Sequence, residues 1–99
     1  MTVIRHAVFR GRVQGVGFRV FVEDAAVRQG LEGWVRNRRD GSVEALFAGS
    51  AEAIDAVIGR CRKGPSASRV DAVDQRDGSA DELALRGPQG DAFAVLPTL

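Results

Sequence analysis

The chain has 99 residues, of which 44% are hydrophobic, and a net charge of +1. This length suits one domain, because a second independent core would be too small, and the apolar share excludes a disordered chain. The near-neutral charge gives no overall attraction to nucleic acid or membranes, and a single cysteine, Cys61, excludes an internal disulfide bond.

The first predicted elements are a strand over residues 6–13 and a helix over residues 18–29. Apolar and polar side chains alternate along the first, as in a strand with one buried face. Apolar residues recur at helical spacing along the second, which Gly30 ends. The two are joined by Val13-Gln14-Gly15-Val16-Gly17-Phe18-Arg19.

This junction predicts a small anion-binding site. Glycine enters left-handed backbone conformations at little cost, so Gly15 and Gly17 permit a sharp turn from strand to helix. The backbone N–H groups of Gly15, Val16, Gly17, Phe18 and Arg19 would then point into one hollow at a helix N-terminus, which favours an anion. The Arg19 guanidinium matches a phosphate or a carboxylate, and we expect a phosphate. A cation at this end of a helix is better explained by a bound anion than by a surface position. Gln14 is expected to tie the loop down.

Further along the chain we predict four more strands, at residues 31–38, 42–48, 69–73 and 92–96. Asp40-Gly41 is a strong hairpin signal between the first two of them. Ser50 is a good N-cap for a one-faced amphipathic helix that Gly64-Pro65 ends. We expect the polar, glycine-rich residues 74–89 to form a loop or irregular hairpin.

This order of elements predicts an α+β fold, a ferredoxin-like β-α-β-β-α-β sandwich with two helices on one face of a mostly antiparallel sheet. The first two strands are joined through a helix and should run parallel, so their C-terminal ends lie at one edge. With the third strand between them, those ends are ~10 Å apart, which is two strand spacings. Arg19 and Asn37 could then reach the same gap.

Two long motifs resemble those of the acylphosphatase family. They are Gly11-Arg12-Val13-Gln14-Gly15-Val16-Gly17-Phe18-Arg19, and Gly30-Leu31-Glu32-Gly33-Trp34-Val35-Arg36-Asn37 followed by Asp40-Gly41-Ser42-Val43-Glu44. Residues 64–70 resemble the family's join into the fourth strand, and Phe93-Ala94-Val95 fits its closing strand. Residues 74–90 depart from any pattern that we can match.

The resemblance implies a single acylphosphatase-like domain over residues 1–99. Such an enzyme hydrolyses the carboxyl-phosphate anhydride of acyl phosphates to carboxylate and inorganic phosphate, without metal or cofactor. By this match the loop amides and Arg19 hold the phosphoryl group, and Asn37 positions the attacking water. The implied partner is a small-molecule acyl phosphate, with phosphate as product. We expect a cytoplasmic monomer with no nucleic-acid or membrane partner.

The chemistry of the residues agrees with an activated substrate. A phosphate monoester would need a nucleophile, a general acid or a metal, and neither motif offers a His, a Cys or paired carboxylates. An acyl phosphate needs less, because its leaving group is a stable carboxylate. The Asn37 amide can orient water but is too weak a base to deprotonate it. The substrate phosphate itself is our hypothesis for the proton acceptor.

Rival interpretations differ in function class. Asn37 taken alone could merely support the adjacent hairpin. The main alternative is a non-catalytic anion-binding or regulatory acylphosphatase-like module, since such domains occur inside larger proteins such as a hydrogenase maturation factor; an end at Leu99 favours a free-standing enzyme. An RNA-recognition motif shares the order of elements, but residues 42–47 lack its basic-Gly-aromatic fingerprint. A P-loop hydrolase would need a Gly-Lys-Ser or Gly-Lys-Thr ending.

Residues outside the two motifs receive structural interpretations. Trp34 and Phe47 are expected to be packing rather than binding residues, Cys61 to be buried and inert, and His6 to be a surface or strand residue without a ligand partner. The arginines expected to be solvated, some of them attracting anions, are Arg10, Arg12, Arg36, Arg38 and Arg39. No signal peptide and no membrane-spanning stretch of ~20 apolar residues is expected.

Overall fold

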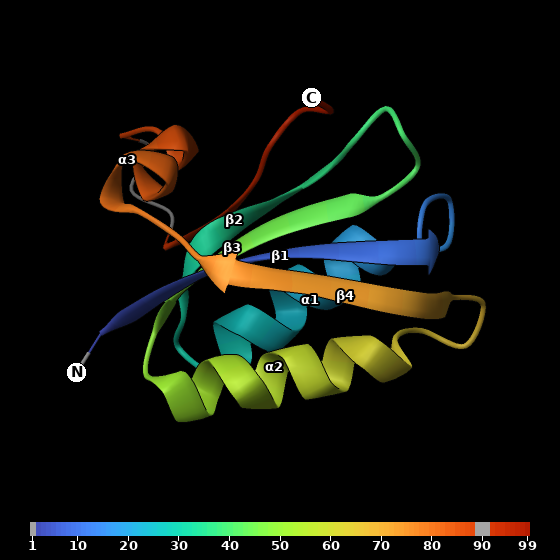
Figure 1. The fold of residues 1–99 in the computed structure, drawn as a ribbon, viewed down its shortest axis with the longest axis horizontal. Coiled ribbons are helices and arrows are strands. Elements are labelled where there is room, and N and C mark those ends of the chain that lie inside the picture. The colour runs from blue at the N-terminus through green and yellow to red at the C-terminus, as the bar shows by residue number, and fades with distance from the viewer. Residues whose placement is uncertain (1, 89–91) are drawn as a thin grey trace.

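The structure is a computed structural model that describes residues 2–88 and 92–99. Figure 1 shows a single sheet with the helices α1 and α2 side by side against one of its faces. In chain order the elements are β1 (Val3–Arg12), α1 (Phe18–Arg28), β2 (Glu32–Asn37), β3 (Val43–Gly49), α2 (Ala51–Lys63), β4 (Arg69–Asp77), α3 (Ala80–Leu83), the 3-10 turn η1 (Ala84–Arg86) and β5 (Phe93–Val95).

The strands lie in the order β4-β1-β3-β2-β5. β1 is antiparallel to both β3 and β4, and β2 is antiparallel to β3. β1 and β2 are therefore parallel, with β3 between them, and their C-terminal ends lie at the same edge of the sheet. The short β5 adds in parallel beside β2. The predicted ferredoxin-like sandwich is confirmed.

A continuous apolar core lies between the sheet and the two helices. Alternate residues of the central strands face it, including Phe9 from β1 and Phe47 from β3, both 0% exposed. α1 contributes Phe18, whose ring meets that of Phe9 edge-on with centroids 5.2 Å apart. Because burying such a side chain contributes about 1.5–3 kcal/mol, these contacts fix the start of α1 on the end of β1.

The ends of the second helix follow from local chemistry. Ser50 Oγ accepts a hydrogen bond from the Ala53 N–H at 3.1 Å, which makes Ser50 the predicted N-cap. Three cations lie in the last turn, where the helix dipole favours them, and Gly64 caps the C-terminus. α2 therefore occupies the range that its cap and its apolar face predict.

Residues 74–88 differ from the predicted loop. β4 continues to Asp77, and residues 80–86 form α3 and η1. Ser79 starts α3 with a capping box, since its hydroxyl accepts from the Glu82 N–H while Glu82 accepts from the Ser79 N–H. The remaining residue of that predicted loop, Gln89, lies outside the described residues, as does Gly90 of the unmatched stretch 74–90.

α3 packs over the sheet face opposite α1 and α2, where it covers a polar cluster. His6 is a strand residue, but it is buried rather than at the surface, and its Nε2 lies 2.6 Å from Glu44 Oε2. Arg36, expected to be solvated, is half-buried and donates from Nε to Glu44 Oε1 at 2.6 Å. Trp34 is buried as predicted, and its Nε1 donates to the Glu82 carbonyl at 2.8 Å.

Candidate active site

Two segments far apart in sequence meet at the edge of the sheet where β1 and β2 end. Figure 1 shows the loop after β1 and the hairpin between β2 and β3 at this same end of the molecule. Phe9 and Asn37 both pair with Val43 of β3, so the three residues form one row across the sheet. Two strand spacings therefore separate the β1 and β2 backbones here, about 10 Å.

The loop after β1 is anchored at both ends and open in the middle. Val13 and Phe18 are each 1% exposed, whereas Gly15 and Gly17 lie at the surface. Their φ angles are +73° and +79°, in the left-handed region that favours glycine. A Cβ built on either glycine would meet no atom within 4 Å, so conformation rather than crowding requires glycine here.

The backbone N–H groups of residues 15–19 are available to a ligand. Within residues 2–88 and 92–99, no hydrogen bond has any of these five groups as its donor. Gly17 is the N-cap of α1, and the first turn of that helix carries no acidic side chain. The helix N-terminus therefore presents an uncompensated positive dipole to the loop, an arrangement that favours a phosphate.

Arg19 is the second residue of α1 and is partly buried. Its guanidinium makes no ion pair or hydrogen bond to the described residues. By contrast, Arg28 at the other end of the same helix pairs with Asp24 at 2.9 Å. A guanidinium that is partly withdrawn from water, without a carboxylate partner, offers its planar donors to a bound oxyanion.

Asn37 is the last residue of β2, and its side-chain oxygen is the unusual feature of the site. Its Oδ1 is buried and has no hydrogen-bond partner in the part of the chain that the structure describes. Buried polar atoms are nearly always paired, so an unpaired one marks a site that a water or ligand completes. The Asn37 backbone carbonyl accepts from the Leu99 N–H at 3.1 Å, which holds the end of the strand in place.

Gln14 joins the two segments directly. Its Nε2 donates to the Arg38 carbonyl at 2.7 Å and to the Ser42 carbonyl at 2.9 Å. The expectation that Gln14 ties the loop down is thereby confirmed, and the structure adds what it is tied to. The anchor is the hairpin that begins immediately after Asn37.

The surrounding charges are mostly positive. The guanidinium groups of Arg12, Arg38 and Arg39 make no ion pair with the described residues. The one carboxylate on the hairpin, Asp40, accepts from the Ser42 hydroxyl at 2.5 Å and from its N–H at 2.9 Å. These hydrogen bonds lower the pKa of Asp40 below its usual 3.8. The site thus combines the N–H groups of residues 15–19, here called the cradle, with guanidinium groups that have no ion-pair partner among the described residues, and this arrangement favours an anionic ligand.

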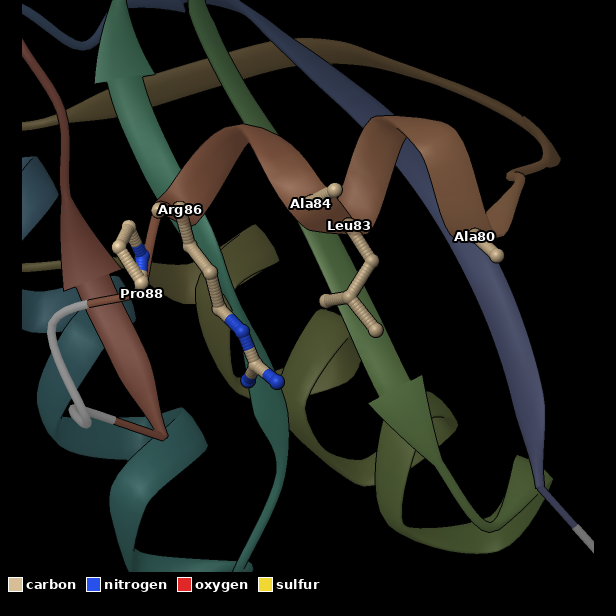
Figure 2. A pocket seen from close by; sticks show the side chains of 6 residues that line it. Ala80, Leu83, Ala84, Arg86 and Pro88 are labelled. Atoms are coloured by element: carbon tan, nitrogen blue, oxygen red, sulfur yellow. The ribbon is translucent and has the colours of Figure 1, made fainter.

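A hollow elsewhere on the surface has different chemistry. A cavity of about 520 Å³ lies against α3 and η1, lined mainly by small and apolar side chains (Figure 2). Arg86, the cation among the described residues that line it, already donates to Glu32 and to the Ala92 carbonyl, each at 2.7 Å. Among the described lining residues, no cationic side chain is therefore left without a partner for a phosphate.

The remaining reactive side chains lie apart from the site. Cys61 is 0% exposed on α2, and burial raises the pKa of its thiol to about 12, in line with the predicted inert residue. Among the residues described, no three His, Cys, Asp or Glu side chains cluster as a metal ion would require. Nor does any helix in that part of the chain reach the length and apolarity of a membrane span.

Comparison with known proteins gives a family match over most of the chain. Residues 5–87 match the family described as Acylphosphatase. An acylphosphatase of Rhodopseudomonas palustris (strain BisB18) is 60% identical over 98 residues, which cover 99% of this chain and 98% of that protein. The crystal structure of acylphosphatase from Bacillus subtilis has a TM-score of 0.80 at 33% identity, covering 97% of this chain and 99% of that one. Full-length HypF, in a phosphate- and nucleotide-bound form, has a TM-score of 0.82 at 27% identity, covering 99% of this chain but 12% of its own.

Proposed function

Since the chain belongs to the acylphosphatase family, we propose that the amides of residues 15–19 and the Arg19 guanidinium bind the phosphoryl group of its substrate. Asn37 orients the water that attacks the phosphorus. Acylphosphatases hydrolyse acyl phosphates, and that is the activity of this chain. Its substrate is accordingly a small-molecule acyl phosphate, and inorganic phosphate is one product.

The reaction is an in-line displacement at phosphorus. The water oxygen forms a bond to phosphorus while the bond from phosphorus to the acyl oxygen breaks, and the carboxylate leaves with the bonding electrons. A phosphoryl oxygen of the substrate takes the proton of the attacking water, because residues 14–19 and Asn37 include no basic side chain other than Arg19, which stays protonated. The leaving carboxylate needs no general acid.

The protein contributes position and electrostatics. Negative charge spreads over the equatorial phosphoryl oxygens in the transition state, and fixed N–H dipoles and a guanidinium stabilise it there. The Asn37 amide accepts from the water and holds it on the side of the phosphorus opposite the leaving group. The acyl group consequently points away from Asn37, towards solvent.

The observation that carries this assignment is the buried Oδ1 of Asn37, which has no partner among the described residues and lies level with Phe9 near the end of β1. A structural asparagine at a hairpin would use its oxygen to bond the turn, whereas this one leaves it unused. The N–H groups of residues 15–19, which donate to no described residue, lie at the same edge. In the part of the chain that the structure describes, the Asn37 Oδ1 and these five N–H groups thus have no protein partner.

The direct test is hydrolysis of benzoyl phosphate with and without excess EDTA. We expect full activity in EDTA, because the proposed site uses only main-chain amides, Arg19 and Asn37. Activity abolished by EDTA and restored by a divalent metal would contradict the proposed mechanism while leaving the family assignment intact.

A non-catalytic module of the same fold remains the second candidate, because the match to HypF covers 12% of that longer chain. Such a module would bind phosphate through the loop without turning over an acyl phosphate. Phosphate binding together with a benzoyl phosphate hydrolysis rate equal to the uncatalysed one would favour it over the enzyme.

We also infer a single domain over residues 1–99 that acts as a cytoplasmic monomer. The exposed edge strand β4 carries charged side chains, including Asp71, Asp74 and Arg76, which oppose edge-to-edge pairing. The single cysteine suits a reducing compartment. Light scattering that gave twice the 10.6 kDa of one chain would overturn the monomer.

A further inference from the structure

We propose that Gln14 is a positioning residue, which sets the distance between the phosphate-binding loop and the water-orienting Asn37. The inference rests on the proposed function, since it assigns the loop to phosphate and Asn37 to water. It adds a residue that touches neither the phosphoryl group nor the water. The proposal is based on two hydrogen bonds that Gln14 Nε2 donates, at 2.7 Å to the Arg38 carbonyl and at 2.9 Å to the Ser42 carbonyl.

The sheet alone leaves the two halves of the site loosely related. β1 and β2 are not neighbours, because β3 lies between them. The loop leaves the sheet after β1, and the hairpin leaves it after Asn37, so both extend beyond the last paired rows. In the described chain, the Gln14 hydrogen bonds are the ones that join residues 14–17 to residues 37–42.

The chemistry requires a carboxamide, and its place is well defined. An amide NH2 has two hydrogens, and the two carbonyls at the ends of the turn take one each. Gln14 directly precedes Gly15, the first of the cradle amides, and Arg38 directly follows Asn37. A shift in the Gln14 hydrogen bonds would therefore move the N–H groups of residues 15–19 relative to the attacking water by a similar amount.

The link is not needed to satisfy the hairpin. The Arg38 carbonyl also accepts from the Gly41 N–H at 3.2 Å, and the Ser42 carbonyl from the Arg38 N–H at 2.9 Å. Removing the Gln14 amide leaves neither carbonyl unpaired, so the loss of folding stability is small. The Gln14 hydrogen bonds are dispensable for the turn, but they join the two halves of the site. We therefore expect them to set the position of the phosphoryl group relative to the attacking water.

The test replaces Gln14 with methionine, which has a similar length but no donor. We measure kcat for benzoyl phosphate and the inhibition constant of inorganic phosphate for wild type, Gln14→Met and Asn37→Ala. The set is completed by the double variant Gln14→Met with Asn37→Ala and by the control Gln29→Met. Gln29 is an exposed glutamine at the far end of α1. Circular dichroism monitors the fold of each protein.

We expect Gln14→Met to lower kcat at least tenfold, since misplacing a reacting group by about 1 Å can cost roughly 100-fold. The phosphate inhibition constant should change less than about threefold, because the cradle itself is intact. In the Asn37→Ala background the same substitution should lower kcat by less than about threefold, since Gln14 acts through Asn37. Gln29→Met should match wild type.

Two results would overturn the proposal. One is a Gln14→Met enzyme whose kcat is unchanged, or whose kcat and phosphate affinity fall in proportion; the other is an undiminished kcat loss in the Asn37→Ala background. A Gln14→Met chain that does not fold would assign the side chain to stability and also overturn it. If Asn37→Ala itself keeps full kcat, the proposed function fails instead.

Discussion

Phe9 and Asn37 lie in one row of the sheet, because both pair with Val43 of the strand between them. Side chains in one row point to the same face, so Asn37 points with Phe9 towards the helix-covered side, which explains why its Oδ1 is buried. β1 continues from this row to Arg12, and the loop after it leads into α1, whose second residue is Arg19. The parallel run of β1 and β2 is therefore what brings the two site residues to one edge.

Replacing Asn37 with alanine should remove the oriented water and spare phosphate binding. We expect kcat for benzoyl phosphate to fall by about 100-fold, because the nucleophile is no longer held in line. The inhibition constant of inorganic phosphate should stay within about threefold of wild type. Steady-state kinetics check both values, and an Asn37→Ala enzyme at full rate would remove the residue from the mechanism.

The same variant should not be less stable than wild type. A buried oxygen without a partner costs about 1–3 kcal/mol of desolvation, which alanine relieves, against the packing lost with the amide. We expect a thermal midpoint equal to or above that of wild type. A midpoint several degrees lower would show that Asn37 is held by contacts that support the fold rather than by function.

Replacing Arg19 with glutamine should weaken phosphate binding as well as turnover. Losing a charge-assisted contact of about 1.5–3 kcal/mol predicts an inhibition constant raised roughly 10- to 100-fold. Arg28→Gln is the matched control, because it removes an arginine of the same helix whose exposed pair with Asp24 contributes little. Equal effects of the two substitutions would mean that Arg19 acts only through general charge.

Alanine at Gly17 should destabilise the protein although the space beside it is open. The φ angle of +79° costs an L-residue about 1–2 kcal/mol. Gly59 in α2 is the control, since it has equal space but ordinary helical backbone, and Gly59→Ala should gain up to about 1 kcal/mol. Urea unfolding measures both, and a Gly17→Ala chain as stable as Gly59→Ala would show that the loop is not held in this conformation.

The sequence predicts those parts of the fold that local signals specify. Gly30, Asp40-Gly41 and the Ser50 cap each act within a few residues, and the corresponding ends of elements are found where expected. The predicted fourth strand ends too early, at residue 73. β4 is an edge strand in which most side chains are exposed, so buried and exposed positions do not alternate along it. The start of α3 did have a signal, the capping box from Ser79 to Glu82.

Contacts between distant residues could not be predicted in this way. The pairing of His6 with Glu44 depends on the register of β1 against β3, in which His6 lies opposite Leu46 and beside Glu44. The motif singles out Asn37, but the burial of its Oδ1, which has no partner among the described residues, follows from the packing of the folded chain. The sequence therefore proposes Arg19 and Asn37 as site residues, and the packing determines their environment.

The buried cluster around Glu44 predicts acid sensitivity. Burial disfavours the Glu44 carboxylate, but hydrogen bonds from His6 and Arg36 outweigh this and lower its pKa below the usual 4.5. A lowered pKa in the folded state stabilises the fold above about pH 4.5, and this stabilisation is lost as the pH falls through the folded-state pKa. At pH 7, wild type should therefore have a higher thermal midpoint than Glu44→Gln. This difference in thermal midpoint should shrink below pH 4. A constant difference across that range would contradict the ion pair.

The central claim is that unpaired amides of residues 15–19 hold the phosphoryl group, and an amide NMR titration with inorganic phosphate tests it most directly. We predict saturable shifts of the Gly15 to Arg19 N–H resonances, strongly weakened in Arg19→Gln and retained in Asn37→Ala. Shifts confined to other residues, or none at concentrations that inhibit the enzyme, would contradict the account.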